Sequence, residues 1–427
     1  MTTKYLQKVG GRVLTSKADR TGNSFYMEYN SGHLTSVSDV TGRVVLTFAY
    51  NADGRIQSVS DVSGRTVRYE YDAAGDLTGV TDALGNKTTY AYNSYHGLTS
   101  KADPLGNAYT IQYDANGKGM VQAILDPAGN KSVFTYDLTN RVMYHTGYDG
   151  TTYKLTFNQD GYITSRERMD ASGSVQQQKV QFMPGGIVTK TDEAGNTTTE
   201  HWDEWGNVLD RVDGEGNEWK YTYAPGNLLS ARTSPLGVTD KWDYDASGRV
   251  VKETLAAGTP DETATAYTYD GFGRLASTTK AGATVSYTYN AAGQPVSVKD
   301  ALGNVSIMEY DSAGDMTAAV DPLGNRSEMT YDAVGNLLTR KDAIGDVTAY
   351  AYDADGRMSS MTDAKGNVTK YEHDFKGRVT KVINALNQGI AMEYDAKGNL
   401  VRSTELGQLN ADGSDADATD NLVTTMT

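Results

Sequence analysis

The sequence predicts an all-β protein of tandem β-hairpin repeats that form one long, curved, spiralling antiparallel sheet. Three observations lead to this fold class. Aromatic residues recur about every 21 residues, Thr, Val and Tyr alternate with other residues before them, and Asp-x-x-Gly turns follow. Self-similarity at a fixed period is the signature of a repeat architecture, in which each unit packs against its neighbours.

The period is set by tyrosines. Tyr29, Tyr50, Tyr71, Tyr92 and Tyr113 are each 21 residues apart, and the same spacing returns from Tyr310 onward. Between these stretches the series continues in partly unequal steps through Tyr136, Phe157, Phe182, Trp202, Tyr223, Tyr244, Tyr269 and Tyr289. We interpret the unequal steps as loop insertions or deletions. The repeat array is therefore expected to cover residues 1–409, followed by an acidic loop insertion at 410–421 and the start of a truncated repeat at 422–427.

Each unit contains two strands and two turns. The segment 64–71 ends in a tyrosine and alternates with the period of two that is typical of a strand. Asp72-Ala-Ala-Gly75 then has the type I turn pattern, a second strand follows over 76–81, and a second turn follows at 82–85. Each unit is thus a β-hairpin that pairs with the next, and Gly75, Gly314 and Gly335 should have positive φ.

The aromatic side chains are expected to stack across the sheet. Tyr69 and Tyr71 are two residues apart and therefore share one face of their strand. Repetition at a fixed period would place one tyrosine beside the next, where an aromatic pair adds roughly 0.5–1.5 kcal/mol beyond burial.

Composition disfavours several classes of protein. The formal net charge of −15 runs against nucleic-acid binding, which needs clustered Lys and Arg. There is no cysteine, so disulfides and thiolate metal sites are excluded. The first residues have no apolar core of signal-peptide length, and no run approaches the ~18 apolar residues of a membrane helix. No cofactor is predicted.

Both ends of the array look cut from a longer array. The strand around Val13-Leu14 would lack its preceding repeat, and Val423–Met426 would be a strand without its next partner. Unpaired strand edges can pair with another chain. We therefore expect association through the ends that increases as salt screens the negative charge.

The tyrosine and turn motifs resemble the YD repeats of Rhs proteins over about residues 8–409. Copies include Tyr71-Asp72-Ala-Ala-Gly75 and Tyr331-Asp332-Ala-Val-Gly335. The signature positions are Tyr29, Tyr50, Tyr71, Asp72, Gly75, Tyr92, Tyr113, Asp114, Gly117, Tyr136, Asp137, Tyr244, Asp245, Gly248, Tyr269, Asp270, Gly273, Tyr310, Asp311, Gly314, Tyr331, Asp332, Gly335, Tyr352, Asp353, Gly356, Tyr394, Asp395 and Gly398.

The resemblance implies a structural role. In Rhs polymorphic toxins and the toxin-carrying subunits of Tc complexes, such repeats form a hollow β-shell around a toxic C-terminal domain. In teneurins, similar repeats serve adhesion. The expected function is thus a non-catalytic wall segment of a secreted or cell-surface bacterial protein, delivered by a secretion system, with the enclosed toxin or effector domain as its partner. Secretion-apparatus components are further possible partners. The alternative is an adhesion module that recognises surface carbohydrate or a partner protein.

Candidate chemistry is sparse. Asp-Pro-x-Gly occurs at Asp103, Asp126 and Asp321, and a related motif marks the autoproteolytic junction of Rhs proteins, but here each copy is in the position of an ordinary repeat turn. Five scattered histidines lack the i, i+4 spacing of a helical zinc site. Carboxylates belong to turns, and the nonapeptide pattern of calcium-binding β-repeats is missing. No catalytic or metal-binding residue is predicted.

The four tryptophans break the pattern and are candidate ligand or cargo contacts: Trp202, Trp205, Trp219 and Trp242. Trp202 takes the place of a repeat tyrosine, so packing explains it equally well. Trp205, inside a turn, is expected to be exposed, where an indole can stack on a sugar ring or on cargo.

Overall fold

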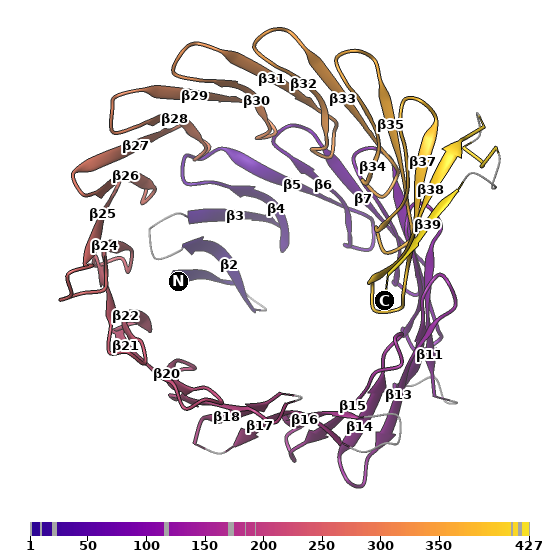
Figure 1. The fold of residues 1–427 in the computed structure, drawn as a ribbon, viewed down its shortest axis with the longest axis horizontal. Helices are drawn as coiled ribbons and strands as arrows, with labels where there is room; N and C mark the ends of the chain where they lie inside the picture. The colour runs from indigo at the N-terminus through magenta and orange to yellow at the C-terminus, as the bar shows by residue number, and fades with distance from the viewer. Residues whose placement is uncertain are drawn as a thin grey trace. The chain divides into compact units, whose positions relative to one another are not determined.

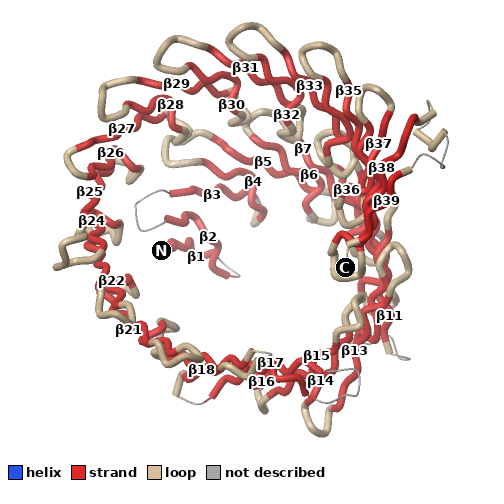
Figure 2. The backbone as a smooth tube through the Cα atoms, viewed as in Figure 1, coloured by secondary structure: helices blue, strands red, loops and turns tan. Residues whose placement is uncertain are grey.

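The computed structural model describes residues 2–8, 11–18, 24–114, 119–169, 175–183, 185–192, 194–410, 413–416 and 421–426. In these ranges all regular structure is β-strand and no helix is present (Figure 2). The described residues therefore include no helix that could cross a membrane. The all-β prediction is confirmed.

The chain divides into two compact units, each described by itself. Unit 1 comprises Met1–Met27, Ser38–Arg43 and Ser132–Val305, and unit 2 comprises Glu28–Val37, Val44–Lys131 and Ser306–Thr427. The strands are β1 (Thr2–Lys8), β2 (Gly11–Ala18), β3 (Ser24–Asn30), β4 (His33–Ser38), β5 (Val44–Tyr50), β6 (Ile56–Asp61), β7 (Thr66–Tyr71), β8 (Leu77–Thr81), β9 (Lys87–Tyr92), β10 (Leu98–Ala102), β11 (Ala108–Tyr113), β12 (Val121–Leu125), β13 (Lys131–Asp137), β14 (Val142–Thr146), β15 (Thr152–Phe157), β16 (Ile163–Met169), β17 (Val175–Met183), β18 (Ile187–Thr191), β19 (Thr197–Trp202), β20 (Val208–Val212), β21 (Glu218–Ala224), β22 (Leu228–Thr233), β23 (Thr239–Tyr244), β24 (Val250–Leu255), β25 (Thr263–Tyr269), β26 (Leu275–Lys280), β27 (Ala283–Tyr289), β28 (Pro295–Lys299), β29 (Val305–Tyr310), β30 (Met316–Val320), β31 (Arg326–Tyr331), β32 (Leu337–Lys341), β33 (Val347–Tyr352), β34 (Met358–Thr362), β35 (Val368–His373), β36 (Val379–Ile383), β37 (Gln388–Tyr394), β38 (Leu400–Gln408) and β39 (Leu422–Thr425).

Successive strands pair antiparallel, as predicted from the alternating strands and the turns between them. Strand β8 pairs with β7 on one side and with β9 on the other, and the same pattern joins β30 to β31 and β31 to β32. We call the turn after the repeat tyrosine the first turn and the turn before the next tyrosine strand the second turn.

Most repeat tyrosines coincide with a break in the strand register, although Tyr136 pairs with Met143 without one. Glu70 pairs with Gly79, whereas Tyr71 pairs with Leu77, so one residue of β8 is skipped. The same shift occurs at Tyr331 and Tyr352. An extra residue opposite one partner is a β-bulge, which bends and twists a strand. A bulge in each of these repeats gives them a regular source of curvature.

The turn glycines have the predicted conformation. Gly75, Gly314 and Gly335 have φ values of 94°, 97° and 90°. In each case the glycine N–H donates to the carbonyl of the turn aspartate, for example Gly335 N to Asp332 O at 3.2 Å. The left-handed conformation is needed here because the chain must reverse within four residues. Gly117, another signature glycine, lies outside the described residues.

The prediction for the N-terminal edge was wrong. Val13 and Leu14 are paired with Leu6 and Tyr5 of β1, so this strand does have a preceding partner. The first seven residues lack a tyrosine-aspartate motif, which is why the sequence pattern did not show them as a strand. At the other edge, β39 pairs with β38. Of the loop 410–421, residues 411–412 and 417–420 lie outside the described residues, and Asp415 forms an isolated bridge with Leu409.

Very little of the chain is fully buried. Among the described residues the buried hydrophobic side chains are Ala123, Ala318, Ile383 and Leu409, and no large side chain is completely enclosed. A sheet that is not covered by a second layer leaves both faces accessible to water. The units are thus built as walls, without the thick core of a globular domain.

Distant parts of the chain lie side by side within unit 2. Strands β5–β7 run beside β30–β35 (Figure 1). We call residues 44–131 the early run and residues 306–427 the late run. Arg65 Nη2 in the early run donates to Ala313 O in the late run at 3.1 Å, and Arg65 Nη1 lies 3.5 Å from Asp315 Oδ2. Second turns of the early run therefore meet first turns of the late run, a contact that we call the seam.

Candidate functional site

Most of the repeat tyrosines hold neighbouring hairpins together through their hydroxyl groups. The hydroxyl of Tyr71 donates to Ile56 O at 2.9 Å, and that of Tyr331 donates to Met316 O at 3.0 Å. The same bond, to a carbonyl fifteen residues earlier, is made by Tyr113, Tyr223, Tyr244, Tyr352 and Tyr394. The acceptor lies where the second strand of the preceding hairpin begins. Phenylalanine could not make this bond, which explains why the repeat uses tyrosine.

A second link joins the turn aspartate to an arginine and to the next tyrosine. Arg378 Nε donates to Asp374 Oδ2 at 2.6 Å, and its guanidinium lies 4.6 Å from the ring centre of Tyr394. Arg249 and Tyr269 repeat this stacking at 4.6 Å. A cation over an aromatic face is attracted by the negative charge of the ring. Each such arginine thus links the aspartate of its own turn to the tyrosine of the following hairpin.

The expected stacking of successive repeat tyrosines was wrong. Among the described residues the ring contacts are His33 with Tyr50, Tyr109 with Phe375, and Phe134 with His145. Successive repeat tyrosines lie two strands apart, about 10 Å, because the second strand of the hairpin runs between them. At that distance their rings cannot touch, and arginine side chains such as Arg378 fill the space.

Three of the tryptophans are half-buried on the wall and one is exposed in a turn. Trp205 is 70% exposed, as predicted. Trp242 Nε1 donates to Glu253 Oε1 at 3.1 Å, and the Arg211 guanidinium lies 5.7 Å from the Trp219 ring. Trp202 Nε1 is buried and has no hydrogen-bond partner among the described residues.

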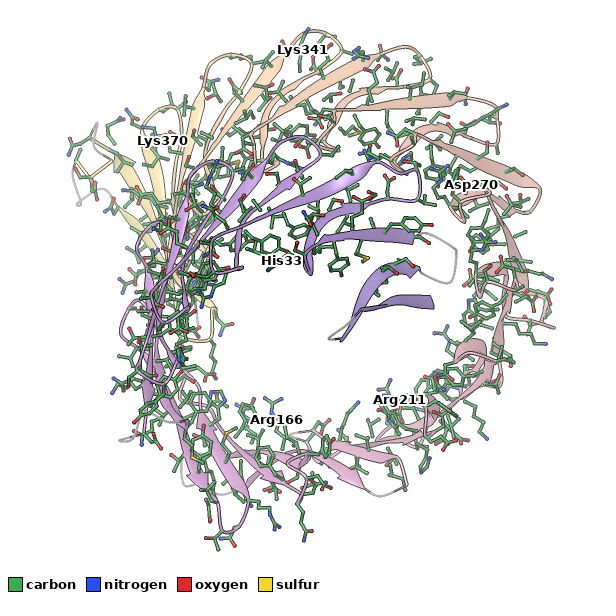
Figure 3. All side chains as sticks on the ribbon, turned by 180° about the vertical axis from the view of Figure 1, so that it is seen from behind. His33, Arg166, Arg211, Asp270, Lys341 and Lys370 are labelled. Carbon is green, nitrogen blue, oxygen red and sulfur yellow. The ribbon has the colours of Figure 1, made fainter. Side chains whose placement is uncertain are left out.

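Arg166 and Arg211 lie on the concave side of the unit 1 sheet (Figure 3).

The residues that the Sequence analysis weighed for chemistry, which are the Asp-Pro-x-Gly aspartates and the histidines, have structural contacts. Asp103, Asp126 and Asp321 each accept the turn N–H of the glycine three residues later, at 2.9–3.0 Å. His145 Nε2 lies 2.8 Å from the buried Ser132 Oγ, and burial, followed by nearby Arg166, lowers its pKa. In the described ranges no cluster of His, Asp and Glu could hold a metal ion.

The seam holds a pair of acids that the sequence did not indicate. The Asp355 carboxyl interacts with the Asp103 carboxyl, although the residues are far apart in sequence. Burial raises the pKa of Asp355, and the charge of Asp103 raises it further. Arg357 Nη2 lies 3.0 Å from Asp355 Oδ2. Both acids line a cavity of about 730 Å³ in unit 2 together with Asp82, Leu84, Val334 and Leu338.

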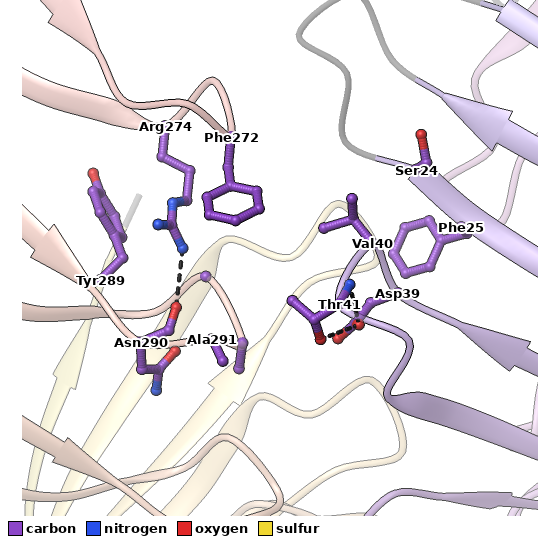
Figure 4. Close-up of a pocket in the computed structure, with 12 residues that line it drawn as sticks. Ser24, Phe25, Asp39, Val40, Thr41, Phe272, Arg274, Tyr289, Asn290 and Ala291 are labelled. Carbon is purple, nitrogen blue, oxygen red and sulfur yellow. Dashed lines mark hydrogen bonds between the residues drawn. The ribbon is translucent and has the colours of Figure 1, made fainter.

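A second cavity lies within unit 1. It has a volume of about 540 Å³, and Phe25 and Phe272 lie on opposite sides of Val40 in its lining (Figure 4). Arg274 closes one side through a 2.9 Å hydrogen bond from Nη1 to Asn290 O. Here too a segment near a second turn meets first turns from far along the chain.

The hairpin geometry agrees with a known repeat family. The family model described as RHS Repeat matches residues 29–66, 50–87, 71–108, 225–260, 244–285, 289–326, 331–368 and 352–388, together more than half of the chain. The chain belongs to the RHS repeat family. Each of the matched repeats forms one β-hairpin, and this repeat fold has a structural role.

Relatives of this RHS repeat protein are much longer. The "Probable deoxyribonuclease RhsB" of Dickeya dadantii (strain 3937) is 27% identical over 137 residues, which are 32% of this chain and 9% of that protein. The crystal structure of TcdB2-TccC3 has a TM-score of 0.48 at 12% identity, over 97% of this chain and 32% of that chain. A TcdB2-TccC3-Cdc42 structure has a TM-score of 0.48 at 14% identity, over 98% and 27%. This RHS repeat chain thus spans about a third or less of each.

Proposed function

We propose that this chain is a stretch of wall that encloses a C-terminal toxin or effector domain of a longer bacterial protein. The observation that carries the proposal is the seam in unit 2. There, turns far apart in sequence meet and hold one run of hairpins against another, as the Arg65 contact with Ala313 does. Hairpins joined in this way make a surface broader than one run, and such a surface can separate a compartment from solvent.

The near-absence of a buried core supports the same function. The four buried hydrophobic residues in the described ranges include two alanines, so these units bury little for their size. A wall needs two accessible faces, one toward the cargo and one toward solvent. The deoxyribonuclease named in the Dickeya dadantii relative belongs to a protein of which the match covers 9%, so its activity is attributed to that protein.

We further propose a bacterial protein that is secreted or displayed at the cell surface. The partners in this proposal are the enclosed domain and the apparatus that delivers it. In this proposal the wall takes no part in catalysis, because its turn aspartates accept hydrogen bonds that close their own turns, as Asp332 and Asp395 do.

The proposal is tested by expressing the parent protein and its C-terminal domain separately inside bacterial cells. We expect the isolated domain to stop growth and the enclosed domain to do so much less. A parent as toxic as its isolated domain would contradict enclosure. Gly335→Val, which strains a turn of the wall, should raise toxicity of the parent toward that of the isolated domain.

One observation favours adhesion as a second candidate function. Trp205 and Tyr162 are 70% and 71% exposed at first turns of unit 1. Exposed aromatic rings can stack on sugars. A glycan array with this chain and Trp205→Ala tests this candidate, and equal or absent binding by both proteins would exclude Trp205 from such a site.

A further inference from the structure

Two turns with the same sequence differ sharply in exposure within unit 2. Asp103-Pro-Leu105-Gly106 and Asp321-Pro-Leu323-Gly324 are identical second turns. Both close with a glycine N–H to aspartate carbonyl bond of 3.0 Å. Leu105 is 49% exposed, whereas Leu323 is 88% exposed. Because the turns themselves are alike, the difference comes from what lies beside them.

The early-run turns are one half of the seam. Asp103 contacts Asp355, and Leu84 lines the same cavity as Val334 and Leu338 of the late run. Leu84 is accordingly 47% exposed. First turns of the late run thus shield the second turns of the early run.

The second turns of the late run are not shielded in this way. Its second turns carry large apolar residues at the third turn position: Leu323, Ile344 and Leu386, which are 88%, 85% and 71% exposed. Lys365 occupies that position in the turn between Ile344 and Leu386. Neighbouring hairpins lie about 10 Å apart, so these side chains form a row. We call this row the late rim.

The complementary edge is also present in unit 2. The first turns of the early run, at residues 51–54, 72–75 and 93–96, correspond in the repeat to the late-run first turns that complete the seam. They are exposed as well: Tyr95 is 53% exposed and the Asp53 side chain 70%. We call these three turns the early rim. Because first and second turns lie at opposite ends of a hairpin, the two rims lie on opposite edges of the unit.

We propose that the late rim of one copy of this chain binds the early rim of a second copy, head to tail, through the same turn-to-turn contact that forms the seam. Exposed rows of leucine and isoleucine favour burial against a partner. Lys365 in the late rim provides a cation for Asp53 and Asp72 of the early rim. Such a contact joins two different surfaces and can therefore extend beyond a dimer.

The test is sedimentation velocity of the intact 427-residue chain over a range of protein and salt concentrations. The net charge of −15 opposes association, so we expect larger species as salt rises and the Debye length falls below ~8 Å. The double variant Leu323→Asp, Ile344→Asp should raise the concentration needed for association at least about tenfold. Tyr95→Asp should do the same from the other rim.

A mixing experiment separates this contact from any other. Each rim variant keeps one intact rim, so an equimolar mixture of the two should form dimers and nothing larger. Thr425→Pro disrupts the edge strand β39 and so tests the association through strand ends that the sequence pattern predicts. As the control for the rim contact, it should leave association unchanged. Wild-type chain that stays monomeric at high salt and high concentration would overturn the proposal. It would also be overturned if Thr425→Pro abolished association, or if the rim variants associated like wild type.

Discussion

The hydroxyl of Tyr331 donates a 3.0 Å hydrogen bond to the carbonyl of Met316, at the start of the second strand of the preceding hairpin. This bond links one repeat to the next at a register break, where the strand ladder itself is interrupted. The hydroxyl, and not only the ring, therefore has a structural role in this repeat.

Tyr331→Phe should therefore destabilise the protein by about 1 kcal/mol, the usual net value of one hydrogen bond. The measurement is chemical unfolding followed by circular dichroism. Tyr350→Phe is the matched control, because the Tyr350 hydroxyl makes no hydrogen bond to the described part of the chain. Equal effects of the two substitutions would show that ring packing, and not the hydroxyl, is what matters.

Gly335→Val should destabilise by more than ~1 kcal/mol, because a β-branched residue is strained at positive φ. The nearest atom to an added Cβ, Asp315 Oδ1, is 3.6 Å away, so the cost arises from the backbone and not from a clash. Gly335→Asn should cost clearly less, since Asn tolerates the left-handed region. Thermal unfolding of the two variants provides the comparison, and similar melting temperatures would contradict this reason.

Asp355→Asn should stabilise the protein at pH 7. The folded-state pKa of Asp355 is raised, so its favourable contribution is present below the unfolded-state pKa and is lost as pH rises through the folded value. The amide keeps a neutral hydrogen-bonding group beside Asp103 at every pH. The gain in melting temperature at pH 7 should shrink as the pH falls below about 4.

The opposite behaviour is expected of Asp395→Asn. A hydrogen bond from Asn399 and further bonds from backbone N–H groups lower the pKa of Asp395, so its contribution is present above the unfolded-state pKa and is lost as pH falls through the folded one. This variant should be less stable than wild type at pH 7 and equal to it in strong acid. Parallel pH profiles for both aspartate variants would contradict the assignment of the seam pair.

The tryptophans should separate into two groups. Trp205→Ala should change the free energy of unfolding by less than about 0.5 kcal/mol, since the side chain is exposed. Trp242→Ala should cost more than about 1 kcal/mol, because it removes a half-buried ring and its bond to Glu253. Denaturant titration measures both, and a large cost at Trp205 would indicate a packing role for that turn.

Local structure could be predicted from the sequence because it is encoded locally. Asp72 and Gly75 specify a turn by themselves, and the alternation before Tyr71 specifies a strand. The contact of Asp103 with Asp355 could not be predicted, since the two residues are far apart in sequence and no local pattern links them. The tyrosine-stacking prediction failed for a related reason: the period gives the spacing along the chain, but the intervening strand sets the distance in space.

The most direct test of the wall function is limited proteolysis of the parent protein. A domain that follows this chain should resist cleavage while the wall is intact, and the same domain expressed alone should be digested rapidly. Cleavage of the domain at the same rate in both forms would contradict enclosure.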